Sequence, residues 1–272
     1  MTDPVASGDR RRGTDRWDVV AGSYGSSPVV TRLAEALVDL VGVRPHESII
    51  DVGTGTGLAL VRAANVAGAG TALGVDRSFA MLKVAARRTT EATVGATLCR
   101  GDAARLPVRD GSFDVAFAAS VWQFLGYESE ALAEWRRVLR PGGRLGFSVP
   151  GAGSGASIAG DLMNKYFAFL TPAVQEDFIS RATARPQPDL AEAAHAAGFT
   201  NVTVADRTWE DSLGSTAEWW AIQSTHAVRF FLDGLDADAQ EALKAEAVDR
   251  LSRSDSGGVI VTTEVRYCVA RL

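Results

Sequence analysis

The sequence predicts an α/β protein built on a doubly wound, largely parallel sheet, and three observations lead to this fold class. Short apolar runs alternate with stretches of helical periodicity between Ser48 and Val149, so each strand is followed by a helix that crosses back over the sheet. The first apolar run ends in D-V-G-T-G-T-G at 51–57, a glycine-rich turn into a helix. A β-branched run from Val259 to Val269 fits a last strand. Parallel crossovers put helices on both faces of such a sheet.

The individual elements follow from periodicity and capping. Ser27-Pro28 offers an N-cap and a proline at the first position of a helix that continues to Val41, and Ser78 is the expected cap of a later helix. The alternating half predicts strands at 48–52, 71–76, 95–100, 113–118 and 143–149 and helices at 57–67, 78–91 and 128–139. After a Gly/Ser/Ala-rich loop at 150–160, the remainder predicts amphipathic segments at 161–182, helices at 188–197, 215–232 and 236–253, and strands at 201–208 and 259–269.

Composition bounds the class of protein. The 272 residues suffice for one large α/β domain with a lid, and the net charge of −5 argues against sequence-independent binding to nucleic acid. Cys99 and Cys268 lie in apolar runs, where we expect small buried side chains in a reducing compartment. No apolar run reaches membrane-spanning length, and the first residues lack a hydrophobic signal core. We therefore expect a cytoplasmic protein with no membrane contact.

Three consecutive turns between a strand and a helix carry the residues that indicate a nucleotide-type ligand. Gly53, Gly55 and Gly57 let the backbone approach a ligand closely. Asp76 ends the second strand about 20 residues later, the position from which an acidic side chain reaches ribose hydroxyls. Asp102, which follows the third strand, can accept a hydrogen bond from an adenine amino group. All three turns lie at strand carboxyl ends, where open α/β sheets bind ligands.

A dinucleotide such as NAD is the competing ligand. Dinucleotide folds prefer the spacing G-x-G-x-x-G, whereas this chain has G-x-G-x-G with an aspartate two residues before the first glycine. The polar stretch L-P-x-x-D-G-S-F-D after Asp102 also has no counterpart in dehydrogenases. The pattern therefore disfavours NAD.

Four ordered blocks resemble the class I methyltransferases that depend on S-adenosylmethionine (SAM), in particular the ubiquinone/menaquinone-biosynthesis-like small-molecule branch. The blocks are D-V-G-T-G-T-G (51–57), G-V-D-R-S-F-A-M-L (74–82), G-D-A-A-R-L-P-V-R-D-G-S-F-D-V (101–115) and R-V-L-R-P-G-G-R-L (137–145). The resemblance covers residues 45–150 closely and the remainder in outline. It implies a Rossmann-like sheet of seven strands, with the last strand antiparallel, and helical lid segments.

The resemblance also implies roles for single residues. Gly53 and Gly55 would lie against the methionine part of SAM, with Asp51 near its amino group. Asp76, followed by Arg77, would bind ribose. The adenine contacts would come from the third turn, and the loop after the fourth strand would contact the methionyl end through backbone atoms; these residues are Gly101, Asp102, Ala103, Ala119 and Ser120. The segment Leu139-Arg140-Pro141-Gly142-Gly143 resembles a structural turn into the fifth strand.

Trp17 and Tyr24 resemble an N-terminal segment of the family that closes over SAM. A phenol at position 24 could donate a hydrogen bond to the cofactor carboxylate, and the alternative is that both aromatic rings pack the segment on the sheet. For Trp17 we favour packing, and for Tyr24 both interpretations stay open.

The residues that would assist chemistry are few. His46 lies in a loop and His195 on a routine surface helix, so His226, in the aromatic segment before the last strand, is the candidate general base. Gln123 follows the fourth strand, where relatives place substrate-facing groups; it can orient a substrate but cannot take its proton. Aromatic residues near 166–169 and 219–231 are typical of packing and also favour a hydrophobic acceptor. No compact cluster of His, Asp and Glu indicates a metal.

We therefore expect a SAM-dependent methyltransferase that methylates an O or C atom of a small, hydrophobic organic acceptor, in secondary metabolism. A cyclase or pericyclase that binds SAM on the same fold, and a non-catalytic SAM-binding subunit, stay open as alternatives. We expect a single domain over 1–272: an N-terminal helical cover (1–44), a SAM-binding core (45–150) and lid insertions at 151–187 and 209–256. The oligomeric state is open, with a homodimer among the options.

Overall fold

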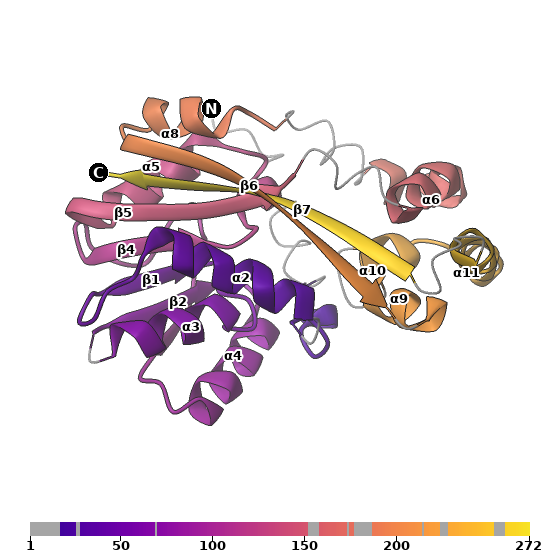
Figure 1. The fold of residues 1–272 in the computed structure, drawn as a ribbon, viewed down its shortest axis with the longest axis horizontal. Helices are drawn as coiled ribbons and strands as arrows, with labels where there is room; N and C mark the ends of the chain where they lie inside the picture. The colour runs from indigo at the N-terminus through magenta and orange to yellow at the C-terminus, as the bar shows by residue number, and fades with distance from the viewer. Residues whose placement is uncertain are drawn as a thin grey trace. The chain divides into compact units, whose positions relative to one another are not determined.

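The computed structural model describes residues 17–25, 28–68, 70–151, 158–172, 174–176, 187–213, 215–223, 228–252 and 259–272. It contains a seven-stranded sheet in the order β3-β2-β1-β4-β5-β7-β6 (Figure 1). The strands are β1 (Ile49–Val52), β2 (Ala72–Asp76), β3 (Thr97–Arg100), β4 (Phe113–Ala118), β5 (Leu139–Pro150), β6 (Thr200–Leu213) and β7 (Val259–Arg271). The first five pair in parallel. The last strand is antiparallel, so the predicted fold class is confirmed.

The chain divides into two compact units. Unit 1 comprises residues 1–149, 187–205 and 266–272, and unit 2 comprises residues 150–186 and 206–265. Strands β6 and β7 each contribute residues to both units. The residue ranges of unit 2 nearly coincide with the two segments predicted as lid insertions, 151–187 and 209–256. The role of these segments in covering a substrate stays a prediction.

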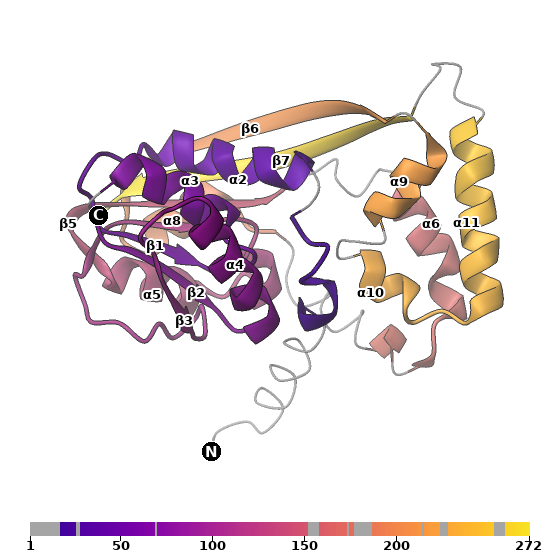
Figure 2. The same cartoon turned by 90° about the horizontal axis from the view of Figure 1, so that it is seen from below.

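Unit 1 carries helices on both faces of its sheet. They are α2 (Pro28–Val41), α3 (Leu58–Ala67), α4 (Phe79–Glu91), α5 (Ser129–Arg137) and α8 (Leu190–Ala196), with a 3₁₀ turn η1 (Trp122–Leu125). Figures 1 and 2 show α2, α3 and α4 on one side and α5 and α8 on the other. Every residue of β1 is buried, as expected for a central parallel strand covered on both faces.

One apolar cluster joins the sheet to α5 and α8. Ile50 and Val52 of β1 lie in this cluster with Leu132 and Trp135 of α5 and with Leu190 of α8. Successive strand residues point to opposite faces, so Ile49 belongs to the other face, where Gly74 of β2 lies so close to Leu60 of α3 that a Cβ there would come within 2.8 Å of it. The cluster therefore packs the central strands against α5 and α8.

Unit 2 has a core of its own. Its helices are α6 (Ile158–Tyr166), η3 (Phe167–Phe169), α9 (Thr216–Gln223), α10 (Val228–Leu232) and α11 (Ala237–Ser252). Tyr166, Trp219 and Phe231 are buried in one cluster with leucines of α6 and α11, so for these three the packing interpretation of the aromatic segments is confirmed. Phe169, in contrast, is exposed. A small cavity beside the cluster is lined almost wholly by apolar side chains, among them Met163, Trp220 and Leu243.

Two predicted elements differ from the structure. Residues 215–232 contain two helices, α9 and α10, in place of one, and residues 224–227 between them lie outside the described part of the chain. The expected turn at Leu139–Gly143 belongs to β5, because Leu139 already pairs with Phe113 and the register shifts before Arg144 pairs with Val115. Gly142 has a φ of 77° in this bulge, so the local signal for a turn was real but the strand continues through it.

Several smaller expectations agree with the structure. Pro28 begins α2, and Ser78 caps α4 by accepting a hydrogen bond from the Met81 N–H. Cys268 is buried and Cys99 partly buried, and both are free thiols. In the described ranges of the chain, no helix is both long and apolar enough to cross a membrane.

Candidate cofactor site

The glycine loop between β1 and α3 adopts a conformation that favours glycine at three positions. Gly53, Gly55 and Gly57 have φ values of 67°, 53° and 81°, in the left-handed region that other residues resist. A Cβ on Gly53 would come within 2.6 Å of the Val121 side chain, and one on Gly57 within 3.1 Å of Ala85. A Cβ on Gly55 would meet only the Gly53 carbonyl oxygen, at 3.9 Å, among described atoms within 4 Å. The loop therefore packs at its two ends and presents open backbone at Gly55.

Asp51 is the penultimate residue of β1, just before this loop, and is fully buried. Its Oδ2 accepts a hydrogen bond of 2.6 Å from the Thr54 hydroxyl, and the Thr54 N–H donates to the Val75 carbonyl of β2 at 2.9 Å. Burial raises the pKa of Asp51 to about 7; the Thr54 hydrogen bond opposes this rise and the negative charge of Asp76 adds to it. Asp51 therefore orients the loop through Thr54. A cation close to its carboxyl group would stabilise the ionised form.

Asp76 links the glycine loop to the two neighbouring strands. Its Oδ2 accepts from the Gly55 N–H and its Oδ1 from the Ser78 N–H, each at 2.8 Å. Its backbone carbonyl accepts from the Gly101 N–H at 3.0 Å. An ionised carboxylate has about four acceptor positions, so these two side-chain bonds leave capacity for the two hydroxyls of a diol. Burial raises the pKa of Asp76, and hydrogen bonds from backbone N–H groups oppose the rise.

The third turn carries Gly101, Asp102 and Ala103 at the end of β3. A Cβ on Gly101 would come within 2.8 Å of Val75, so the turn is packed against β2. Asp102 Oδ1 accepts from the Ala104 N–H at 3.0 Å, a bond within the turn that holds the side chain in place. Ala103 is buried. The Arg77 carbonyl accepts a hydrogen bond from Arg100 Nε at 2.9 Å, which ties β3 to the second turn.

The fourth corner follows β4. Ser120 has a φ of 54°, and its N–H donates to the Ser148 hydroxyl of β5 at 3.0 Å; Ala119 precedes it and is partly buried. Gln123 Nε2 donates to the Ser120 carbonyl at 2.9 Å. Gln123 Oε1 is buried and has no hydrogen-bond partner among the described residues. A buried acceptor without a donor is costly, so this oxygen is a place where a ligand hydrogen would be favourable.

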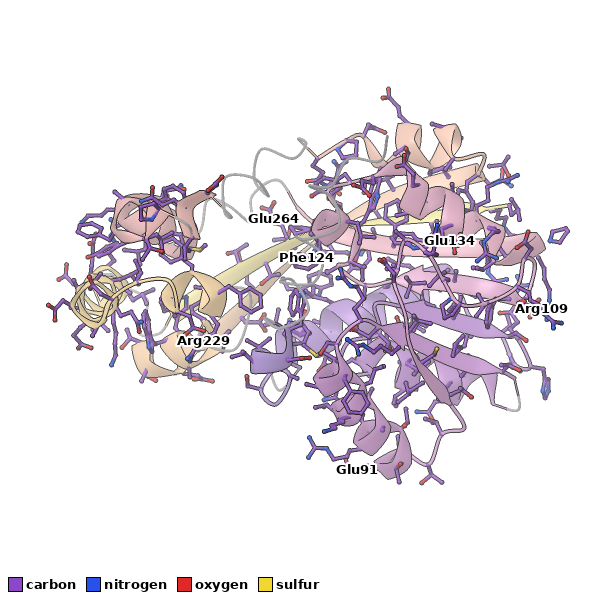
Figure 3. All side chains as sticks on the ribbon, turned by 180° about the vertical axis from the view of Figure 1, so that it is seen from behind. Glu91, Arg109, Phe124, Glu134, Arg229 and Glu264 are labelled. Carbon is purple, nitrogen blue, oxygen red and sulfur yellow. The ribbon has the colours of Figure 1, made fainter. Side chains whose placement is uncertain are left out.

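Two aromatic residues of this corner differ in exposure. Trp122 is buried and donates from Nε1 to the Glu128 carbonyl at 3.0 Å, whereas Phe124 is 50% exposed and is labelled in Figure 3. Trp122 is therefore a core residue, and Phe124 is not.

The N-terminal segment, residues 17–25, crosses over these corners. The Ser78 hydroxyl donates to the Asp18 carboxylate, and the Trp17 ring packs edge-on against Phe124 with ring centroids 4.9 Å apart. Trp17 also packs against Tyr24 at 5.6 Å, so the packing interpretation of Trp17 is confirmed. Burial raises the pKa of Tyr24 to about 12, and the Asp76 charge adds to the rise. The phenol therefore stays protonated, as a donor.

Arg88 of α4 fastens this segment to the glycine loop. Its Nη1 donates to the Thr56 carbonyl at 2.6 Å and to the Thr56 hydroxyl at 2.8 Å, and its Nη2 lies 3.5 Å from the Gly25 carbonyl. A Cβ on Gly25 would come within 2.6 Å of Thr56 Oγ1. Nothing in the spacing of the sequence singled out Arg88, because a helical arginine has no local signal for a contact 32 residues away.

The structure brings together most of the predicted site residues, and His46 and His195 take no part in the bonds that join them. Asp51, the loop glycines, Asp76 and Gly101 are joined by the bonds above. His46 and His195 are exposed, as expected, and the His195 Nδ1 lies 3.1 Å from the Phe199 carbonyl. His226 lies outside the described residues, so its proposed role stays a prediction.

Comparison with known proteins identifies the class that this geometry belongs to. A family profile described as a methyltransferase domain matches residues 50–147. The nocamycin O-methyltransferase of Saccharothrix syringae is 28% identical over 271 residues, 94% of this chain and 97% of that protein. The demethylmenaquinone methyltransferase of Beutenbergia cavernae is 31% identical over 179 residues, 61% of this chain and 71% of that protein. The chain belongs to the SAM-dependent methyltransferase family.

A solved structure agrees with this fold. The Haemonchus contortus phosphoethanolamine N-methyltransferase 2, in complex with SAM, matches with a TM-score of 0.56 at 20% identity over 96% of this chain and 56% of that chain. Some other curated relatives match over less of their length, and the chain spans 33% to 55% of four of them. The family resemblance, the SAM cofactor and the assignment to an enzyme class are confirmed.

The backbone geometry and the charges of the site are compatible with SAM. The open backbone face at Gly55 is a cradle that a side chain would fill, and Asp76 keeps acceptor capacity for a diol. Two carboxyl groups whose pKa values are raised by burial would be stabilised in their ionised forms by a ligand that carries an ammonium and a sulfonium group.

Replacing Asp76 by alanine is expected to weaken SAM binding by roughly 1–3 kcal/mol, the scale of losing hydrogen bonds to a charged group. Calorimetric titration with SAM measures the change. Asp114→Ala is the matched control, because Asp114 also accepts a backbone N–H, from Ser48 at 2.8 Å, but at the opposite end of its strand. Equal SAM affinity in the Asp76 variant and the control would refute the assignment of Asp76 to ribose.

Replacing Asp51 by asparagine is expected to change how stability depends on pH. Since the pKa of Asp51 is raised to about 7 in the folded state, the wild type loses stability as pH rises from the ordinary aspartate range toward 7, with a slope of up to about 1.4 kcal/mol per pH unit. The asparagine variant lacks this loss, so it gains relative to wild type over that range. Denaturant unfolding at pH 4.5 to 8 measures the difference.

Asp114→Asn is the control with the opposite sign. Burial raises the pKa of Asp114, but the hydrogen bonds from the Ser48 N–H and Arg140 outweigh it and hold that pKa below its usual range. This variant is expected to lose stability relative to wild type as pH rises toward the ordinary aspartate pKa near 4, so the unfolding series for this control is extended below pH 4.5. A constant difference between Asp51→Asn and wild type across the whole range would contradict the account of Asp51.

Proposed function

We propose that this chain transfers a methyl group from SAM to an O or C atom of a small, hydrophobic organic acceptor, in secondary metabolism. The observation that carries the proposal is the meeting of three strand carboxyl ends, those of β1, β2 and β3, at Asp76 in a chain that belongs to the SAM-dependent methyltransferase family. The similarity to the nocamycin O-methyltransferase over almost the whole of both chains supports a small-molecule acceptor and an oxygen target.

In this proposal, different site residues contact different parts of the cofactor. Gly53 and Gly55 line the methionine part, and Asp76, with Arg77 beside it, takes the ribose. The adenine binds to the turn of Gly101, Asp102 and Ala103, whose packing is described above. The methionyl end lies among Asp51, the backbone of Ala119 and Ser120, and the Tyr24 phenol. The placement of Tyr24 is supported by the raised pKa of its phenol, about 12. The phenol therefore stays protonated and can donate a hydrogen bond to a carboxylate.

The chain's own contribution to the reaction is binding, orientation and exclusion of water. When bound, SAM supplies a methyl group already activated on a sulfonium, so the transfer needs alignment of the acceptor more than it needs acid or base. The segment of residues 17–25 crosses the corners and is fastened there by Ser78, Phe124 and Arg88. Holding that segment closed would keep water away from the reacting centre.

Gln123 is the proposed orienting residue for the acceptor. Its Nε2 is held by the Ser120 carbonyl, so its Oε1 is fixed as an acceptor that lacks a partner among the described residues. A hydroxyl or enol hydrogen of the acceptor would satisfy it. The neighbouring Phe124 is 50% exposed and packs against Trp17, which favours an apolar body on the acceptor. His226, if the acceptor needs a base, supplies it in this proposal.

Turnover tests the function directly. Purified protein incubated with SAM and a panel of phenols, enols and carboxylic acids on hydrophobic frameworks is expected to form S-adenosylhomocysteine together with a methylated product, measured by mass spectrometry. Gln123→Met is expected to lower the turnover number about tenfold, the scale of one lost hydrogen bond to a polar group, while SAM affinity stays the same.

The other outcomes separate the alternatives. A product formed without consumption of SAM would identify a cyclase that uses SAM as a bound element. Tight SAM binding with no product across the panel would favour a non-catalytic subunit. Loss of SAM affinity in Gln123→Met would remove this residue from the acceptor side and place its effect on the cofactor.

A further inference from the structure

The loop from Gly101 to Ser112, between β3 and β4, contains the proposed adenine contacts but no helix or strand of its own. Its internal order is limited to a bridge between Asp102 and Arg105 and a few turn bonds. Backbone groups of such a loop need partners elsewhere if the loop is to keep one conformation. These partners come from about one turn of α5, at Glu134, Trp135 and Arg137.

Trp135 holds the loop at the residue next to Asp102. Its indole Nε1 donates to the Ala103 carbonyl at 2.9 Å, and its side chain is fully buried in the cluster under the sheet. A buried indole N–H without an acceptor would be costly, so the bond both satisfies the tryptophan and fixes the Ala103 peptide. The position of Ala103 is therefore set from α5.

Glu134 and Arg137 hold the following residues of the loop from the same side. Glu134, labelled on α5 in Figure 3, accepts the Leu106 N–H at 2.6 Å. Arg137 donates to the Leu106 carbonyl at 3.2 Å, to the Val108 carbonyl at 2.9 Å and to Asp110 at 2.6 Å. The guanidinium also makes two bonds to Glu134, at 2.8 and 2.7 Å. These bonds hold the pKa of Glu134 below its usual range, against the effect of burial.

We propose that Trp135, Glu134 and Arg137 are positioning residues that set the selectivity of the site for adenine, although none of them touches the base. The inference rests on the proposed adenine role of Asp102 and Ala103. Discrimination between bases depends on donors and acceptors held in place, because a displaced hydrogen bond is lost to water. The α5 contacts hold the loop at Ala103, the last of the proposed adenine contacts, and at three positions downstream of it.

Adenine and hypoxanthine differ at the atom that matters here. The exocyclic amino group of adenine donates to the Asp102 carboxylate, whereas hypoxanthine has a carbonyl oxygen there and would face that carboxylate as a second acceptor. A correctly held turn therefore rejects the hypoxanthine analogue. A loosened turn can move away from the carbonyl oxygen, so it would reject the analogue less while also binding the adenosyl compound less well.

The test compares the binding of S-adenosylhomocysteine with that of its hypoxanthine analogue by calorimetry. Trp135→Phe keeps an aromatic ring in the core and removes the N–H bonded to Ala103. We expect the affinity ratio of the two compounds to fall about tenfold in this variant. Trp122→Phe is the matched control, because Trp122 is equally buried and its indole N–H also donates to a backbone carbonyl, that of Glu128. The ratio is expected to stay at the wild-type value in the control.

A second pair of variants separates position from packing. Glu134→Ala removes the acceptor for the Leu106 N–H, whereas Glu134→Gln keeps an acceptor oxygen at the same reach. We expect the ratio to fall in the alanine variant and to be largely restored in the glutamine variant. Thermal unfolding checks that each variant is folded at the temperature of the titration. Wild-type ratios in both Trp135→Phe and Glu134→Ala would overturn the inference.

Asp102→Ala distinguishes failure of this inference from failure of the proposed cofactor site. A lowered ratio in Asp102→Ala, with wild-type ratios in the α5 variants, would leave the adenine assignment standing and reject the role of α5. A wild-type ratio in Asp102→Ala would reject the adenine assignment and the inference with it. Loss of the ratio in Trp122→Phe as well as in Trp135→Phe would show a general effect of core damage and would also reject it.

Discussion

The site depends on one carboxylate and the backbone groups gathered around it. The Asp76 side chain accepts a hydrogen bond from the Gly55 N–H, and its backbone carbonyl accepts one from the Gly101 N–H. The first and third turns are therefore both hydrogen-bonded to the second. The bond from the Thr54 N–H to Val75 adds a further link between β1 and β2. These bonds fix the positions of three loops, which are separate in sequence, relative to one another. A single extended ligand can therefore contact all three.

This arrangement places negative charge where water is scarce. Asp51 and Asp76 both have pKa values raised by burial, and the negative charge of Asp76 raises the pKa of Asp51 further. Backbone N–H groups and the Thr54 hydroxyl offset part of that cost. A ligand that carries an ammonium and a sulfonium would offset more, which gives a physical reason why a cationic methyl donor suits this site.

The turns were predictable from sequence because their requirements are local. Gly53, Gly55 and Gly57 are needed for positive φ values and close approach, and Asp76 follows at a distance set by one strand and one helix. The alternation of strands and helices likewise specified the parallel part of the sheet. The bulged start of β5 was missed because Gly142 is a turn signal taken alone, and only pairing with β4 shows that the strand continues.

The supporting contacts were not predictable, since each joins residues far apart in the chain through ordinary side chains. Arg88 reaches Thr56 across 32 residues and Trp135 reaches Ala103 across 32 residues, and neither position carries a distinctive local pattern. Gln123 was singled out from its place after β4, but only the structure shows that its buried Oε1 has no hydrogen-bond partner in the described part of the chain.

A crystal structure of the complex with S-adenosylhomocysteine tests the central claim most directly. The account predicts both ribose hydroxyls on the Asp76 carboxylate, with the Gly55 N–H still bonded to the same side chain and the methionine part against the open face of the glycine loop. Density for the nucleoside away from Asp76, or a carboxylate that turns from Gly55 when the ligand binds, would contradict it.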